Sequence, residues 1–373
     1  MTKLLIVVYR DSELSGGSVR VAEIIAATLP ALGFEVHALV AYGGAGRLGR
    51  ILGDRCRYVR SSGPHDVSGW VRFIRMCREI KPDIVHFVDS VGWMIVLSAF
   101  IRARVVSHQH FRPDVGPDGV RRLPRIRHLS RFSDRVIAIS FGAASVLGSK
   151  CKVPASKVRV VHNAVSPSYL DDAPLTAPRL GGQRVLGMAV RVVEDKGVED
   201  AIRLLSFLPD RFSLQIAGDG PAREKLERFS ALLGVANRVV WLGAVRDISN
   251  FYREIDYYLY ASWYEGFGLS VAEAMWSGKP VVGFSGDGEI FEQQFPLLTA
   301  ENSLLVPRSR PGEFSAERLD SVFIELRDRL LQLDAESPKY LALAGAGREW
   351  VRARFGASRF GRAVADVYRD LIE

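Results

Sequence analysis

The stretch WYEGFGLSVAEAMWSGKPVV, residues 263–282, places two glutamates eight residues apart, on either side of a glycine turn. Gly266 and Gly268 can adopt backbone conformations that other residues rarely reach, and they let a ligand approach the main chain closely. A helix is predicted to begin near Leu269, and the unpaired N–H groups at a helix N-terminus attract anions. The stretch therefore predicts either a well-capped helix or the floor of a site for a charged ligand.

A purely structural role would explain one of the two glutamates but not the other. Ser270 and Glu273 have the spacing of a capping box, in which the serine accepts a backbone N–H and the glutamate reaches back to the helix start. That pairing would give Glu273 a purely structural role. Glu265 has no comparable role, and a carboxylate among aromatic side chains suits sugar hydroxyls, which donate hydrogen bonds to its oxygens.

Short apolar, β-branched runs alternate with amphipathic helical stretches along the chain. This alternation is typical of parallel sheets covered by crossover helices. The strands are expected at 4–9, 34–42, 83–88, 104–108, 135–140 and 158–162, and again at 185–190, 212–218, 238–243, 257–262, 280–285 and 304–307.

The chain of 373 residues is too long for one ordinary core and fits two domains. We expect an α/β chain with two Rossmann-like domains facing across a cleft, with ligands at the carboxyl ends of the strands. The first domain spans 1–168, a Pro- and Gly-rich linker spans 169–183, and the second domain spans 184–357. The last helix, 358–373, is expected to complete the first domain.

The bulk composition excludes several classes of protein. The uncharged apolar run 91–101 is too short for a membrane span, which needs about 20 residues. The N-terminal apolar run indicates a first strand and not a signal peptide. The three scattered cysteines, at 56, 77 and 151, have neither metal nor disulfide spacing, which favours a reducing cytoplasm.

The charge is uneven, and the first half is strongly basic. Residues 1–160 hold 25 Lys and Arg against 12 Asp and Glu, whereas 161–373 hold 25 against 30. A basic half suggests an anionic partner, which the charge leaves open as nucleic acid, a membrane surface or a phosphorylated substrate.

Two segments carry much of this charge, 68–82 and 120–131. Each is either an ordinary crossover helix with solvated charges or a basic helix lying on an anionic membrane. In 68–82 one helical face is expected to hold Trp70, Phe73, Ile74 and Cys77. No recognised nucleic-acid-binding module appears in the sequence, so no nucleic-acid partner is expected.

A second cluster of charge follows the first strand of the second domain. Arg191 and Lys196 lie in that loop, where two cations suit a diphosphate. They could equally pair with the neighbouring Glu194 and Asp195. The glycine turn AGDGP, 217–221, is a lone G-x-G, and neither half carries the G-x-G-x-x-G of a dinucleotide oxidoreductase.

These segments together resemble a known family. The spaced glutamates with EAMWSGKPVV, preceded by VRVVEDKG, AGDGP and RVVWLG, look like the signature of retaining glycosyltransferases of the GT-B fold, family 4 (glycosyl transferases group 1). In the first half, SGGSVRVAEI, VVSHQHF, DRVIAIS and VRVVHNAV are similar to that family's N-terminal domain. The resemblance runs from about residue 4 to residue 370.

The resemblance implies a role for each matching position. Glu273 would hold the ribose and Glu265 the donor sugar, while Arg191 and Lys196 would hold the diphosphate. The remaining implied site residues are the backbone N–H groups of Phe267, Gly268 and Leu269, the glycines Gly16 and Gly17 at the diphosphate, and His110 at the sugar–phosphate junction.

The chain departs from the family pattern at three places. His108 lies on the same strand face as His110, and either could be the functional histidine. The usual Asn-Gly after the interdomain strand is Asn163-Ala164, and either Glu289 or Glu292 could match the family's later glutamate.

The implied reaction moves a hexose-type sugar from a nucleotide-diphosphate donor, with retention, to a lipid-linked or saccharide acceptor in envelope polysaccharide or glycolipid synthesis. No D-x-D occurs in the sequence, so neither a metal nor another cofactor is expected. The place of action would be the cytoplasm, peripherally at the inner face of the plasma membrane. The alternatives are a nucleotide-sugar epimerase or hydrolase on the same scaffold and, from a different class, a basic nucleic-acid-binding protein.

Overall fold

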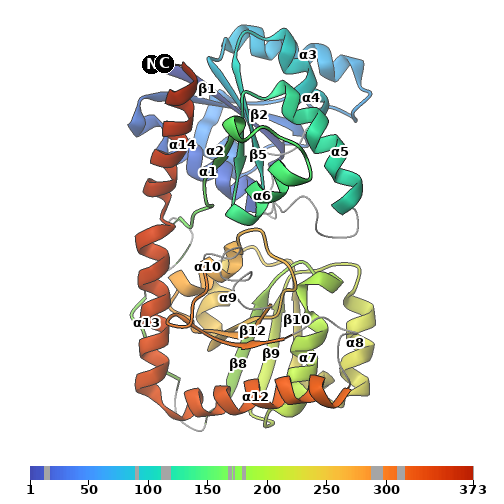
Figure 1. Ribbon diagram of the computed structural model, residues 1–373, viewed down its shortest axis with the longest axis vertical. Helices are drawn as coiled ribbons and strands as arrows, with labels where there is room; N and C mark the ends of the chain where they lie inside the picture. Colours follow the sequence, from blue (N-terminus) through green and yellow to red (C-terminus); the bar gives the residue numbers. More distant parts are fainter. Residues whose placement is uncertain are drawn as a thin grey trace. The chain divides into compact units, whose positions relative to one another are not determined.

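The computed structural model divides the chain into two compact units, which are drawn in Figure 1. Unit 1 comprises Met1–Ala164 and Gly356–Glu373, and unit 2 comprises Val165–Phe355. The structure describes residues 1–11, 17–88, 92–110, 119–166, 170, 173–178, 182–286, 297–308 and 316–372. Leu175 and Ala177, from the expected linker, pack against the core of unit 2.

Unit 1 is built on a parallel sheet in the order β3-β2-β1-β4-β5-β6-β7. Its strands are β1 (Thr2–Arg10), β2 (Phe34–Tyr42), β3 (Cys56–Tyr58), β4 (Ile84–Phe87), β5 (Arg104–Gln109), β6 (Arg135–Ala138) and β7 (Val158–Val160). The sequence did not predict β3, because three residues are too few to show a period.

Helices cover both faces of this sheet. They are α1 (Gly17–Thr28), α2 (Arg47–Leu52), α3 (Val67–Ile80), α4 (Gly92–Leu97), α5 (Gly119–Leu129), α6 (Phe141–Ser149) and α14 (Ala357–Ile372). Because side chains alternate along a strand, Leu4 and Ile6 of β1 pack with α1 and α14, while Leu5 and Val7 pack with α3 and α4.

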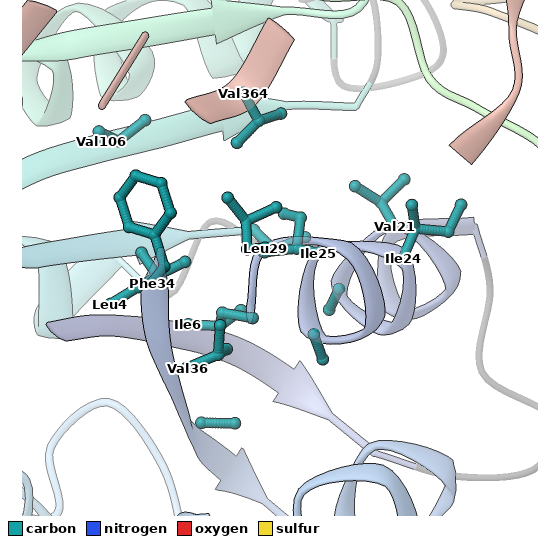
Figure 2. Packing of buried hydrophobic residues seen from close by; sticks show 14 of the residues in the cluster. Leu4, Ile6, Val21, Ile24, Ile25, Leu29, Phe34, Val36, Val106 and Val364 are labelled. Atoms are coloured by element: carbon teal, nitrogen blue, oxygen red, sulfur yellow. The ribbon is translucent and has the colours of Figure 1, made fainter. Parts of the chain in front are cut away.

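Helix α14 belongs to unit 1 although it comes last in the chain. Phe360, Val364 and Tyr368 recur with the helical period, and all three are buried in the core with α1. Figure 2 shows Val364 in this cluster near Leu29.

Unit 2 has a second parallel sheet, in the order β10-β9-β8-β11-β12-β13. Its strands are β8 (Arg184–Ala189), β9 (Phe212–Ala217), β10 (Val239–Gly243), β11 (Tyr257–Tyr260), β12 (Val281–Ser285) and β13 (Ser303–Pro307). Its helices are α7 (Val198–Phe207), α8 (Arg223–Leu232), α9 (Ile248–Glu254), α10 (Leu269–Trp276), α12 (Ala316–Ala335) and α13 (Ser337–Arg354).

A buried ion pair closes the amino-terminal edge of this sheet. Arg184, at the start of β8, donates to Asp334 of α12. Arg211 Nη2 and Tyr257 Oη donate to the same carboxylate at 2.8 and 3.0 Å. The contacts anchor the end of α12 to the sheet.

Both sheets have the doubly wound order 3-2-1-4-5-6, which confirms the expected two-domain Rossmann-like fold. In this order the chain runs outward in opposite directions from the first and fourth strands. The loops after these two strands lie side by side at the carboxyl edge, where such sheets bind ligands.

Candidate functional site

In unit 2, the two loops at the switch point are those that the sequence analysis singled out. The loop after β8 carries Arg191 and Lys196, and the loop after β11 carries Glu265 and the glycine turn. Strands β8 and β11 pair directly, with Leu186 opposite Tyr257. The topology therefore brings together the residues that the sequence had placed about 70 positions apart.

The glycine turn ends at helix α10 as predicted. Gly268 has φ +79° and is the N-cap of the helix, and Leu269 is its first residue. A left-handed residue at this position favours glycine, because it lacks a Cβ. The first turn of α10, whose backbone N–H groups have no partner within the helix, begins directly after Gly268.

The capping-box interpretation of the second glutamate is wrong. With Gly268 as N-cap, Ser270 is the second residue of the helix and Glu273 the fifth, two positions beyond those of a capping box. The Ser270 hydroxyl instead accepts a hydrogen bond from Tyr258 Oη at 2.7 Å, and Glu273 accepts one from Tyr252 Oη at 2.9 Å. Glu273 is 2% exposed, so the Tyr252 hydroxyl bonds a buried carboxylate here.

Glu265 and Lys196 form an ion pair. Lys196 Nζ donates to Glu265 Oε1 at 2.7 Å and to the Tyr264 carbonyl at 3.3 Å. The Ser262 hydroxyl donates to the same carboxylate oxygen at 3.1 Å. The pairing of Lys196 with its neighbours in sequence is thus not observed, and Glu194 instead lies 3.7 Å from Lys225.

The remaining residues of unit 2 that the sequence proposed for donor binding occupy different environments. Arg191 is exposed, beyond the end of β8. The side chain of Phe267 is buried against Phe355, with ring centroids 5.3 Å apart, so only its backbone can face a ligand. Leu269 is partly exposed at the start of α10.

Unit 1 presents a column of histidine rings beside β5. The rings of His108 and His110 lie 4.1 Å apart, and those of His86 and His108 lie 5.3 Å apart. His86 Nδ1 is hydrogen-bonded to Tyr368 Oη of α14. Burial lowers the pKa of His86 to about 3 and lowers the pKa of His108 well below its usual value.

The structure places the two candidate histidines differently. His108 is 2% exposed within the sheet, while His110 is partly exposed just beyond its end. Gly17 begins α1, and Asn163 is buried. Gly16, Glu289 and Glu292 lie outside the described residues.

The sequence analysis missed Arg308, which follows β13. Its side chain is 4% exposed, and it donates to Asp200 and to the Ala261 carbonyl. Its only signal in the sequence was an arginine directly after a short apolar strand.

The basic segment 68–82 forms α3, a crossover helix packed on the sheet through Phe73, Cys77 and Ile80. Ile74 is partly buried and packs against this same core, as expected, whereas Trp70 is not part of it. Both side chains also border the surface of the helix. They line a surface cavity of about 480 Å³ together with Val67, Val71, Arg75, Arg78 and Glu79. The other basic segment, 120–131, forms most of α5.

Within the described part of the chain, no helix is both long and apolar enough to cross a membrane. The described residues also include no group of three or more His, Cys, Asp or Glu side chains that could hold a metal ion.

Two family models match the chain in succession. The model described as Glycosyltransferase Family 4 matches residues 15–169, and the model described as Glycosyl transferases group 1 matches residues 183–320. Together they cover both units of the structure.

Curated proteins match over part of their length. The 2-deoxystreptamine glucosyltransferase of Streptomyces kanamyceticus is 28% identical over 268 residues, 68% of this chain and 62% of the relative. The lipopolysaccharide core biosynthesis glycosyltransferase LpsE of Rhizobium meliloti is 30% identical over 211 residues, 49% of this chain and 59% of the relative. The chain thus spans less than two thirds of either relative.

Solved structures match over the whole chain. The crystal structure of Anabaena HepE in complex with UDP and glucose aligns with a TM-score of 0.77 at 19% identity, covering 99% of this chain and 100% of that one. At this identity the match shows the two-domain fold.

Proposed function

Because the chain belongs to the group 1 glycosyltransferases, we propose that it transfers a hexose-type sugar from a nucleotide-diphosphate donor to a lipid-linked or saccharide acceptor of the cell envelope. The transfer retains the configuration at the anomeric carbon. LpsE is named for lipopolysaccharide core biosynthesis, which supports an envelope acceptor, and HepE was crystallised with UDP and glucose, which supports a UDP-hexose donor.

The observation that carries this proposal is the meeting of opposite charges at the switch point of unit 2. Lys196 and Glu265 lie 2.7 Å apart, next to the N-terminus of α10. A diphosphate needs cations and N–H donors, whereas a sugar needs hydroxyl acceptors. One small area supplies both.

In the proposed mechanism, the bond from the anomeric carbon to the donor phosphate breaks, and negative charge develops on the leaving diphosphate. Arg191, Lys196 and the first N–H groups of α10 stabilise that charge, and such fixed groups supply several kcal/mol. We propose that they do so without a metal or other cofactor. Lys196 turns from Glu265 toward the phosphate, which leaves Glu265 to accept hydrogen bonds from the sugar.

The other proposed contacts are with the nucleoside and from unit 1. Glu273 accepts hydrogen bonds from the ribose hydroxyls, with Tyr252 holding its carboxylate. Gly17 at the start of α1 faces the diphosphate, and His110 faces the sugar–phosphate junction. Its position just beyond the carboxyl end of β5 supports His110 over His108, which lies within the strand.

A panel of UDP-, GDP- and ADP-hexoses tests the donor site through thermal unfolding. At a hundredfold excess over Kd, a true donor should raise the Tm by about 5–10 °C, since binding adds about 2.7 kcal/mol. Lys196→Met and Glu265→Gln should reduce this shift, whereas Lys225→Met, which alters an exposed lysine of the same unit, should not. No shift with any donor would refute the proposal.

Product analysis separates transfer from the rival activities. Nucleotide diphosphate release that needs an acceptor supports a transferase, whereas acceptor-independent release points to a hydrolase. An α-linked product from an α-linked donor would support retention.

For the acceptor, we propose that the α3 face of unit 1 lies on an anionic lipid surface at the cytoplasmic side of the membrane. Val67 and Val71 are 61% and 63% exposed beside Arg75 and Arg78, a combination that suits an interfacial helix. The three cysteines are free, which supports a reducing compartment.

Vesicles of phosphatidylcholine, with and without phosphatidylglycerol, test this surface by co-sedimentation at low salt. Binding should require the anionic lipid and weaken in Val71→Ser. The matched control is Leu232→Ser, which removes an exposed apolar side chain of unit 2. Equal sedimentation with both lipids, or none, counts against membrane docking.

A further inference from the structure

Arg308 is buried at the carboxyl edge of the unit 2 sheet, with a partner on each side of its guanidinium. Nη1 donates to Asp200, and Nη2 donates to the Ala261 carbonyl. The guanidinium also lies over the ring of Trp263, 3.7 Å from its centroid. A buried charge needs such partners, because an unpaired one is costly to remove from water.

These partners belong to the two loops of the candidate site. Ala261 and Trp263 flank Ser262, whose hydroxyl donates to Glu265 at 3.1 Å. Asp200 lies in the first turn of α7, directly after the short 3-10 turn that ends at Lys196.

The same two loops also meet through their backbones. Trp263 N–H donates to the Asp195 carbonyl at 2.9 Å. Gly197 packs so closely on the other loop that a Cβ there would lie 1.8 Å from the Ala261 oxygen. The guanidinium therefore joins segments that already touch next to the Lys196–Glu265 pair.

Stability alone does not require an ion pair at this place. Replacing a buried ion pair by well-packed apolar residues is often neutral or stabilising. Unit 2 contains a second buried pair, Arg184–Asp334, at the opposite edge of the same sheet. The two arginines are 4% and 1% exposed, so they are similarly buried but lie at opposite edges of the sheet.

We propose that Arg308 is a positioning residue: it fixes the loop that carries Glu265 against the turn that carries Lys196. The planar fork of the guanidinium bonds Asp200 and Ala261 at once while it stacks on Trp263. A lysine ammonium has the charge but not this geometry. The catalytic part of this inference rests on the proposed function, since it takes Lys196 and Glu265 to be the donor site.

The test compares Arg308→Lys with Arg184→Lys in the full chain. Hydrogen–deuterium exchange without ligand measures the loops directly. In Arg308→Lys, the amides of 194–200 and 261–268 should exchange at least about tenfold faster. In Arg184→Lys, these loops should keep the wild-type rate, and any acceleration should lie near α12. This readout requires no enzymatic activity.

Activity is the second readout, measured with the donor that the hexose panel identifies and at equal distance below each variant's Tm. Arg308→Lys should lower kcat/KM at least about tenfold, and Arg184→Lys less than about threefold, because small displacements of reacting groups are costly. If Arg308→Lys fails to fold, Asp200→Asn and Asp334→Asn form the same matched comparison.

The outcomes distinguish a failure of the positioning role of Arg308 from a failure of the proposed function. Unchanged exchange of both loops in Arg308→Lys overturns the positioning role, as does an equal fall in kcat/KM for both arginine variants. If no donor is used by the wild type, the proposed function fails, and the exchange data still decide whether Arg308 fixes the loops.

Discussion

Replacing Lys196 by methionine and Glu265 by glutamine, singly and together, measures how strongly the pair at the switch point is coupled. At 2.7 Å and an effective dielectric constant of about 20, the Coulomb attraction is about 6 kcal/mol. Desolvation and lost side-chain freedom offset most of it. Exposed pairs retain about 0.2–1 kcal/mol, and hydrogen bonds to charged groups retain about 1.5–3 kcal/mol.

The side chains of Lys196 and Glu265 are 21% and 15% exposed, so we expect a coupling of about 1.5–3 kcal/mol. The control is the Arg228–Glu224 pair on α8, which has the same 2.7 Å distance but side chains 68% and 82% exposed. Its coupling should be at most about 0.5 kcal/mol.

Urea unfolding followed by tryptophan fluorescence supplies the free energies, since four of the six tryptophans lie in unit 2. Equal couplings for the two pairs would refute the reasoning from burial. Repeating the double-mutant cycle with saturating UDP tests whether Lys196 binds the diphosphate. The coupling should fall, because phosphate oxygens then compete with Glu265 for the Lys196 ammonium. An unchanged coupling would mean that the lysine does not meet the diphosphate.

Three further predictions concern single positions. The depressed pKa of His86, about 3 against about 6.5 unfolded, means that only the unfolded state takes up its proton as the pH falls below 6.5. The unfolding free energy should therefore drop by about 1.4 kcal/mol per pH unit from this group, and His86→Asn should remove that share of the slope between pH 6 and 4. Gly197→Ala should cost at least about 2 kcal/mol, since φ is +65° and the new Cβ would clash with Ala261. Gly234→Ala, with φ +70° and open space, should cost only about 1 kcal/mol in the same urea titration, and equal losses would contradict the clash. Tyr252→Phe should cost about 1.5–3 kcal/mol by removing the one hydroxyl proton that a buried carboxylate and a backbone carbonyl share, and a loss below about 0.5 kcal/mol would show that water replaces it.

Much of the fold could be predicted from the sequence because its signals are periodic and local. Buried parallel strands are continuous apolar runs, and the start of α10 follows from Gly268. The three residues of β3 have no period to detect. The amphipathic period of α14 predicted a packed helix that completes the first domain, and the helix does lie in the core of unit 1. Its individual partners on α1 follow only from the tertiary structure.

The sequence proposed members of the candidate site but not their contacts. Glu265 and Lys196 were both proposed, yet nothing in the sequence indicates that they pair with each other across 69 residues. The capping-box spacing of Ser270 and Glu273 was misleading, because the cap is decided by the backbone conformation of Gly268. The proposed role of Arg308 depends on its contacts with Asp200 and Ala261, which are far from it in the sequence.

The order of elements along the chain has a consequence for synthesis. Domains generally fold as units, with the first-made domain folding first. Here a ribosome must translate all of unit 2 before it reaches the segment that carries Phe360 and Val364. The N-terminal part of unit 1 therefore leaves the ribosome with an exposed apolar surface, and α14 covers that surface only later. The later-made half can finish folding first, so the order of completion is the reverse of the order of translation.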